Sequence, residues 1–378
     1  MADVMADDTA RAWAYLSRVA EPPCPELAAL AARVGAVEAA DRIRRCAVGG
    51  ELARLTEARR EIDCAAEDLD TLARLGGRLM VADGPEWPMA SFRSFQGVDA
   101  RARPQSHSPL VLWAVGPLAL TDVEDRGCSI VGTRAATPYG EHVAADLAAG
   151  LAERDVAVVS GGAYGIDGAA HRATLAADGL TVAVLAGGID VPYPAGHTAL
   201  LRRIADDGLI VSEYPPGVRP ARYRFLTRNR LVAALSGATV VVEAGLRSGA
   251  ANTAAWARAL GRPVCAVPGP VTSSASVGCH VLVRGGAELV TRAAEVVELV
   301  GRAGELAPEP DRPSTPLDGL TDVERRVYDA LPARGARTAD QVAVAAGLPA
   351  TQVLGPLATL ELVGLVKRQE GRWKLAVR

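Results

Sequence analysis

The chain has 378 residues, of which 49% are hydrophobic but only 4% aromatic, and its formal net charge is −3. This length allows two or three domains with at least one sizeable core, and the near-neutral charge excludes a protein that coats nucleic acid through its overall field, although a local basic groove remains open. No run approaches the roughly 18 apolar residues of a membrane span, and the acidic start MADVMADDTARAW is unlike a signal peptide, so we expect a cytoplasmic protein without a membrane partner.

Residues 1–76 are predicted to form a small helical, SAM-like domain. Apolar residues recur at three-to-four spacing in ARAWAYLSRV, PELAALAARVG and EDLDTLARLG, and Gly35 and Gly76 stand where helices would stop. Segment 77–126 contains several prolines and one convincing strand, PLVLWAVG. We expect this segment to be an irregular connector packed on the domain that follows.

From Gly127 onward the pattern alternates between apolar strands, glycine turns and helices. The strands are CSIV, VAVVS, TVAVLAGG, LIVSEYPPG, ATVVVEAG and PVCAVPG. Near-continuous apolar strands between helices are typical of a doubly wound, mainly parallel α/β sheet that is covered on both faces. Ligands of such sheets bind at the carboxyl ends of the strands, where all the glycine clusters fall.

Residues 303–318, AGELAPEPDRPSTPLD, are predicted to be a linker, and residues 319–378 a winged helix. Capping-box patterns begin at Thr321 and Thr338, a third amphipathic helix follows, and two alternating strands meet at Glu370-Gly371. The third helix has no Lys or Arg before Lys367. The pattern therefore leaves open whether this domain binds duplex DNA, another protein or its own partner subunit.

Four glycine-rich or basic motifs follow the predicted strands. The first two place Gly132, Thr133 and Arg134 in SIVGTRAATPYG, and Ser160, Gly161 and Gly162 in VSGGAYGIDGAAH; the others place Arg222, Phe225, Arg228, Asn229 and Arg230 in RYRFLTRNR, and Ser248 and Gly249 in VEAGLRSGAANTA. A turn that opens a helix aims free N–H groups at one point and suits a phosphate. Arginines beside an aromatic ring suit single-stranded nucleic acid, although RYRFLTRNR also fits a solvated helix start.

The chain lacks the common nucleotide and catalytic signatures. Ala163 replaces the second glycine of GxGxxG, and neither a GxxxxGK[ST] loop nor a GxSxG elbow occurs. Six scattered cysteines without CxxC, and histidines without HExxH, predict no disulfide framework and no metal site.

Three carboxylates and one histidine remain as acid–base candidates. Asp167 and His171 are four residues apart on a predicted helix, where a structural contact is favoured over an acid–base pair. Glu213 and Glu243 each stand at the end of a predicted strand. A general base could occupy such a position, and so could a carboxylate that accepts a hydrogen bond from a ribose or an amide. We predict no catalytic residue.

Taken in order and spacing, these motifs resemble the DprA/Smf family of DNA-processing proteins. The resemblance also includes LAGGIDVPYPAGH, SEYPPG, GRPVCAVPG and GAELV, and it covers about 108–300 closely. It implies an extended Rossmann-like DNA-binding domain over 77–302, with its core at 108–300. It also implies a protein that is not an enzyme, needs no cofactor, and binds single-stranded DNA in a basic pocket. Such a protein would act as a homodimer, protect incoming DNA during natural transformation and recombination, and load the RecA recombinase.

The resemblance carries roles to matching residues. Gly132, Thr133, Arg134 and the turn Ser160-Gly161-Gly162 would hold backbone phosphates, and Phe225 would stack a base. Arg222, Arg228, Asn229 and Arg230 would line the pocket, with Ser248 and Gly249 at a helix start beside it. Asp167, His171, Asp190, Glu213 and Glu243 would organise the pocket.

Two other function classes remain open. Nucleoside-monophosphate phosphoribohydrolases share the superfamily, but their PGGxGTxxE loop corresponds here to GLRSGAANTA, which lacks the glutamate. A winged-helix transcription regulator is the other class, and the uncharged third helix weakens it because such a helix normally contacts the major groove.

Overall fold

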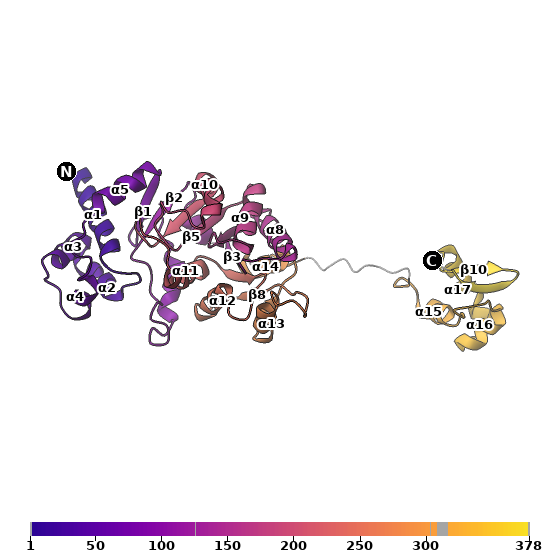
Figure 1. The fold of residues 1–378 in the computed structure, drawn as a ribbon. Coiled ribbons are helices and arrows are strands. Elements are labelled where there is room, and N and C mark those ends of the chain that lie inside the picture. The colour runs from indigo at the N-terminus through magenta and orange to yellow at the C-terminus, as the bar shows by residue number, and fades with distance from the viewer. Residues whose placement is uncertain (1, 125, 303, 308–316, 377–378) are drawn as a thin grey trace. The chain divides into compact units, whose positions relative to one another are not determined.

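The computed structural model describes residues 2–124, 126–302, 304–307 and 317–376, without the side chains of residues 2–6. The chain divides into two compact units, Met1–Ala307 and Pro308–Arg378 (Figure 1). Most of the predicted linker 303–318 lies outside the described residues.

Five helices form the N-terminal part: α1 (Ala2–Val19), α2 (Pro25–Val34), α3 (Ala36–Arg44), α4 (Gly50–Thr56) and α5 (Ala65–Arg74). Gly35 and Gly76 follow helices as predicted, with φ of 83° and 67° that favour glycine. Helices α3 and α4 were not predicted, because nine and seven residues are too few to establish a helical period.

A nine-stranded sheet forms the centre of the first unit, in the order β1-β2-β6-β5-β4-β3-β7-β8-β9. Its strands are β1 (Gly77–Val81), β2 (Val111–Val115), β3 (Gly127–Val131), β4 (Ala157–Ser160), β5 (Thr181–Leu185), β6 (Leu209–Ser212), β7 (Ala238–Val241), β8 (Val264–Ala266) and β9 (Glu288–Leu289). Strands β3 to β9 pair in parallel, which confirms the mainly parallel α/β sheet.

The connector 77–126 extends this sheet, so the prediction of an irregular segment with one strand was wrong. Strand β2 pairs antiparallel with β6, and β1 pairs antiparallel with β2, placing Leu79 opposite Trp113. The segment also contains the helices α6 (Met89–Arg93) and α7 (Leu120–Glu124). The segment GRLMV forms a strand because it pairs with β2. Its own sequence lacks the alternation of apolar and polar residues that would predict a strand.

Helices cover both faces of the sheet (Figure 1). They are α8 (Pro138–Ala152), α9 (Ile166–Ala176), α10 (Thr198–Asp207), α11 (Arg222–Ala234), α12 (Gly249–Ala259), α13 (Val277–Arg284) and α14 (Ala293–Val300). Successive strand residues contribute to opposite faces: Val158 packs with α8, α9 and α14, whereas Val159 belongs to the core that includes α11 and α12. The doubly wound arrangement is therefore confirmed.

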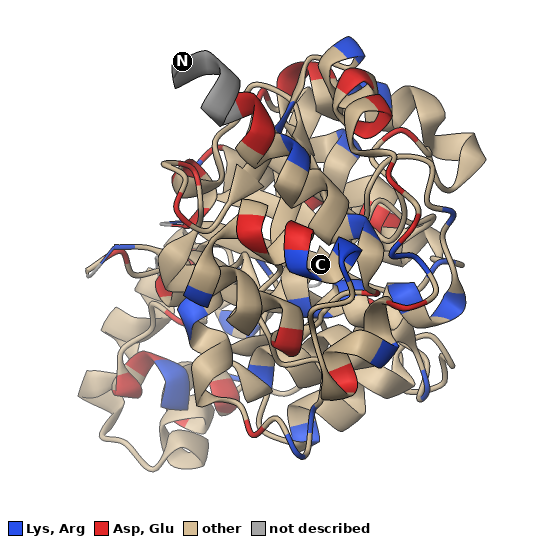
Figure 2. Cartoon of the chain, turned by 90° about the vertical axis from the view of Figure 1, so that its left-hand side faces the viewer, with Lys and Arg blue, Asp and Glu red and all other residues tan. Residues whose placement is uncertain are grey.

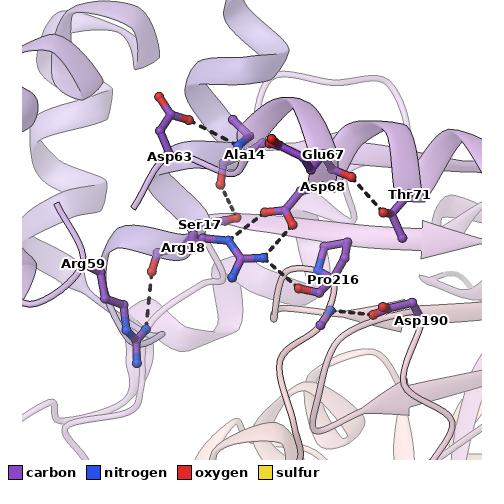
Figure 3. A network of polar contacts seen from close by, with 12 residues as sticks. Ala14, Ser17, Arg18, Arg59, Asp63, Glu67, Asp68, Thr71, Asp190 and Pro216 are labelled. Carbon is purple, nitrogen blue, oxygen red and sulfur yellow. Dashed lines mark hydrogen bonds and ion pairs between the residues drawn. The ribbon is translucent and has the colours of Figure 1, made fainter. Parts of the chain in front are cut away.

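The N-terminal helices share a hydrophobic core with one end of the sheet. Tyr15 and Leu16 of α1 belong to the same buried cluster as Trp113 of β2. A polar network joins the same two parts (Figure 3): Arg18 donates to both Asp68 carboxylate oxygens, at 2.6 and 2.8 Å, and to the carbonyl oxygen of Pro216 at 2.7 Å. The boundary at 76/77 therefore separates two sequence patterns that fold onto one core.

The second unit is a winged helix, as predicted. It contains α15 (Asp322–Asp329), α16 (Ala339–Ala346), α17 (Leu354–Leu362) and the antiparallel strands β10 (Val366–Gln369) and β11 (Arg372–Leu375). Both predicted capping boxes form, at Thr321 and Thr338. Glu370 and Gly371 both have positive φ, as a two-residue hairpin turn of this hand requires.

Within the described residues, no single helix is long and apolar enough to cross a membrane. One pair of helical segments, Ala339–Ala346 and Ala350–Leu362, reaches the length and apolar composition of a membrane span only when the two are combined, and the pair is bent by 102°.

Candidate nucleic-acid site

Acidic and basic residues are intermixed over the chain (Figure 2), so any basic site must be local. A hollow of about 670 Å³ lies where β3 and β4 end and α11 and α12 begin. A larger hollow, of about 950 Å³, lies between α1–α3 and the connector, but none of the predicted motifs reaches it. The smaller hollow is therefore the candidate site.

The four predicted motifs all reach this hollow. The predicted residues that line it are Gly132, Thr133, Arg134, Gly161, Asp167, Arg222, Phe225, Arg228, Asn229, Ser248 and Gly249. Seven predicted residues do not line it: Ser160, Gly162, His171, Asp190, Glu213, Arg230 and Glu243. The parallel sheet brings the motifs together because its strand ends share one edge.

The exposed part of the site combines two arginines with three aromatic rings, those of Tyr193, Tyr223 and Phe225. Arg134 and Arg222 are exposed and form no ion pair within the described part of the chain. The Arg134 guanidinium lies 4.9 Å from the centroid of the Phe225 ring, and the Tyr193 ring centroid lies 5.4 Å from that of Phe225. Sequence reasoning missed Tyr193 as a site residue, although the quoted motif LAGGIDVPYPAGH contains it.

The glycine turn after β4 is already satisfied from within the protein. Asp167 accepts hydrogen bonds from the N–H groups of Gly161 and Ala163, at 3.2 and 3.4 Å. Ser160 is buried, and its hydroxyl donates to the carbonyl oxygen of Ile130 at 2.6 Å. Ser160 and the N–H of Gly161 therefore already have partners within the protein, which disfavours them as phosphate ligands, and phosphate binding by the turn Ser160-Gly161-Gly162 stays a prediction.

Arg228 forms the buried floor of the hollow. Its Nη1 donates to the carbonyl oxygen of Val184. Burial lowers the pKa of Arg228 to about 10, although the Asp167 charge acts in the opposite direction. Burial likewise raises the pKa of Asp167, against the effect of Arg228. The charges of Arg228 and Asp167 therefore oppose each other at the floor of the hollow. The net positive charge of the hollow comes from Arg134 and Arg222.

Gly161 is required by close approach to Arg228. A Cβ atom at this position would overlap the guanidinium. We expect Gly161→Ala to lower the free energy of unfolding by about 1–3 kcal/mol, as overpacked substitutions do, measured by urea denaturation. Gly249→Ala is the control, because a Cβ there meets nothing within 4 Å in the same hollow. Equal stability of both variants would show that the guanidinium moves aside without cost.

Glu243 and Asn229 support the loops around the hollow. The Glu243 carboxylate accepts from the N–H and the hydroxyl of Thr137, at 2.9 and 2.6 Å, and its carbonyl oxygen accepts from the N–H of Thr133 at 2.8 Å. Asn229 Nδ2 donates to the carbonyl oxygen of Gly249 at 3.3 Å and to Oδ1 of Asn252 at 3.2 Å. Glu243 thus fixes the loop that carries Arg134.

Arg230 does not line the hollow, so that prediction was wrong. Its side chain is 0% exposed and pairs with the Glu213 carboxylate at 2.6 and 2.7 Å. Residues two apart on a helix point in nearly opposite directions, so Arg228 and Arg230 cannot both face the hollow. Burial raises the pKa of Glu213, although the Arg230 charge lowers it.

His171 and Asp190 also lie away from the hollow, so a role in organising it would act through the surrounding scaffold. His171 is buried, its Nδ1 lies 2.8 Å from the Thr181 hydroxyl, and no hydrogen bond joins it to Asp167 within the described residues. Burial lowers the pKa of His171 to about 3. Asp190 instead accepts from the N–H of Gly217 at 2.7 Å (Figure 3). Both residues stabilise the scaffold.

In the ranges that the structure describes, no three His, Cys, Asp or Glu side chains gather as a metal site would need.

Comparison with known proteins places these features in one family. The family model described as DNA recombination-mediator protein A matches residues 79–301, and a DprA winged helix domain model matches residues 308–372. A Mycobacterium tuberculosis protein, provisionally named DNA processing protein DprA, is 70% identical over 371 residues, which cover 98% of this chain and 95% of the relative.

More distant relatives agree with this match. DNA processing protein DprA of Streptococcus pneumoniae is 40% identical over 190 residues, which cover 50% of this chain and 66% of the relative. The X-ray structure of DNA processing protein A from Streptococcus pneumoniae aligns with a TM-score of 0.62 and 28% identity, over 76% of this chain and 96% of that one.

Proposed function

The chain belongs to the DNA recombination-mediator protein A family, also named DprA/Smf, and from that premise we propose that it binds single-stranded DNA in the hollow at the ends of β3 and β4. The family's role is DNA processing. The finer proposal is that the hollow holds backbone phosphates and bases of a single strand, and that the protein protects incoming strands during natural transformation and recombination.

One observation carries this proposal: two unpaired exposed arginines, Arg134 and Arg222, share a hollow with the rings of Phe225 and Tyr193. Guanidinium groups bind phosphate oxygens through paired N–H donors, and aromatic rings stack on bases of any sequence. A duplex hides the faces of its bases, so this combination favours a single strand.

The site supports binding rather than catalysis. The two glutamates that end strands are both engaged within the protein, Glu213 with Arg230 and Glu243 with Thr137. Neither is free to act as the general base of a phosphoribohydrolase.

Fluorescence anisotropy of a labelled, mixed-sequence single-stranded oligonucleotide at several salt concentrations tests the proposal. We expect affinity to fall as salt rises, because phosphate contacts release counterions. Unlabelled duplex and mononucleotide should compete weakly. Displacement by a mononucleotide, or no strand binding at low salt, would contradict the proposal.

We further propose that the protein acts in the cytoplasm as a homodimer that loads RecA onto the bound strand. The strand β9 is the last strand of the sheet, and its Leu289 and Val281 of the preceding helix α13 are each 52% exposed. Exposed apolar side chains beside an unpaired edge favour association. Stimulation of RecA's ATP hydrolysis on protein-bound strands tests the loading step.

Val281→Asp should convert the dimer to monomers, because a carboxylate in an apolar interface loses its hydration. Sedimentation equilibrium measures the change. Leu180→Asp introduces the same charge at a partly exposed leucine away from β9 and should leave the dimer intact. A dimer that survives Val281→Asp would place the interface elsewhere.

A further inference from the structure

Two exposed tyrosines lie beside the candidate DNA site without a core to pack against. Tyr193, in the loop between β5 and α10, is 44% exposed, and Tyr164, in the turn between β4 and α9, is 46% exposed. Neither ring is needed for the three hydrophobic clusters of the first unit.

The Phe225 ring is too crowded to act as the whole stacking surface. Arg134 lies over it at 4.9 Å, and the Tyr193 ring is 5.4 Å away and tilted by 49°. A base inserted between two rings needs centroids roughly 7 Å apart, twice a stacking distance of about 3.4 Å. A base therefore cannot enter between Phe225 and Tyr193. A base can instead stack on the exposed face of the Tyr193 ring.

Tyr164 is held in place by the loop that carries Tyr193. Its hydroxyl accepts a hydrogen bond from the N–H of Gly196 at 3.2 Å, and its ring meets that of His197 edge to face at 4.7 Å. His197 is buried, and its Nδ1 lies 3.0 Å from the carbonyl oxygen of Gly162. Tyr164 is thus fixed before any ligand binds, which lowers the entropy lost on binding.

An unpaired cation lies at the far end of this surface. Arg172 of α9 is exposed and forms no ion pair among the described residues. A Cβ atom on Gly168 would meet both Arg172 and His197, so the Arg172 guanidinium lies near the residue that supports Tyr164. Aromatic platforms followed by a cation match the alternation of bases and phosphates along a strand.

We propose that Tyr193, in the wall of the hollow, and Tyr164, outside it, stack successive bases, so that the strand leaves the site over the loop between β5 and α10 toward Arg172. This inference rests on the proposed single-strand binding and deepens it. It assigns the direction of the strand and a second group of binding residues, and it predicts that affinity depends on oligonucleotide length.

Anisotropy titrations of the full chain with two labelled oligo-dT probes, one of about 4 and one of about 12 nucleotides, test this direction. Site sizes of ssDNA-binding folds span this range. We expect Tyr193→Ala and Tyr164→Ala each to weaken binding of the longer probe by about tenfold, the usual effect of losing one stacked base. The shorter probe should bind the Tyr164→Ala variant almost as the wild type, whereas Tyr193→Ala should weaken both probes because Tyr193 lines the hollow. Tyr193→Phe should retain the wild-type affinity.

Tyr139→Ala is the matched control, because Tyr139 is 42% exposed and makes one hydrogen bond but does not line the hollow. Wild-type binding of both probes with no effect of Tyr164→Ala on the longer one would overturn this inference alone. No binding of either probe by the wild type would instead overturn the proposed function. Thermal denaturation of each variant separates loss of a ring from loss of the fold.

Discussion

The double variant Arg134→Ala with Arg222→Glu should bind single-stranded DNA at least about a hundredfold more weakly than the wild type. Hydrogen bonds to charged groups contribute about 1.5–3 kcal/mol each, and this variant removes two phosphate partners and adds a repelling charge. The logarithmic dependence of affinity on salt should also become shallower by about one for each lost phosphate contact. Anisotropy at three or more salt concentrations measures both effects.

The fold should survive this double variant, because Arg134 and Arg222 are exposed and form no ion pair within the described ranges. Arg33→Ala with Arg74→Glu makes the same change of charge on α2 and α5, away from the hollow. It should alter affinity little. If both double variants lost affinity equally, the effect would come from overall charge and the hollow would not be the binding site.

Glu213→Gln should lower the free energy of unfolding by about 3–5 kcal/mol. The substitution leaves the Arg230 guanidinium buried without a counter-charge, which is the costly way to break a buried pair. Arg230 donates to both Glu213 oxygens through Nη2, and its Nε and Nη1 have no hydrogen-bond partner among the described residues, so Glu213 is its principal support. Guanidinium chloride denaturation, with the slope checked for two-state behaviour, measures the loss.

Two further variants isolate the charge effect. Glu213→Leu with Arg230→Met replaces the pair by apolar groups and should recover most of the lost stability, because neither charge is then buried alone. Glu38→Gln breaks the exposed pair with Arg42 and should cost well under 1 kcal/mol. A stable Glu213→Gln protein would mean that water reaches Arg230 and that the pair is not desolvated.

The pairing of Arg230 also explains how α11 presents its cations. Arg224 is tied to Glu21 at 2.7 Å, Arg230 to Glu213, and Arg228 to the carbonyl oxygen of Val184. Burial raises the pKa of Glu21, but hydrogen bonds from Arg224 and Arg59 outweigh it and leave that pKa lowered. Arg222, the first residue of α11, has no hydrogen bond or ion pair among the described residues. The positive charge available to a ligand is therefore concentrated at the start of the helix.

Local sequence determined much of this protein. Strand-and-glycine alternation predicted the parallel sheet, Thr321 and Thr338 predicted two helix starts, and the spacing of the motifs predicted one shared edge. Each of these features depends on short-range physics: the two-residue period of a strand, a capping hydroxyl, or a backbone that only glycine adopts.

Only the tertiary structure decided which groups are free to bind. Sequence proximity placed Arg228 and Arg230 together, but the helix turned one to the hollow and buried the other against Glu213. The sequence predicted that Ser160 and the amide of Gly161 bind phosphate, but in the structure they bond to the carbonyl oxygen of Ile130 and to the carboxylate of Asp167. A hydrogen-bonding group binds a ligand only if the fold leaves it unsatisfied and accessible, and its partners come from segments far away in the sequence.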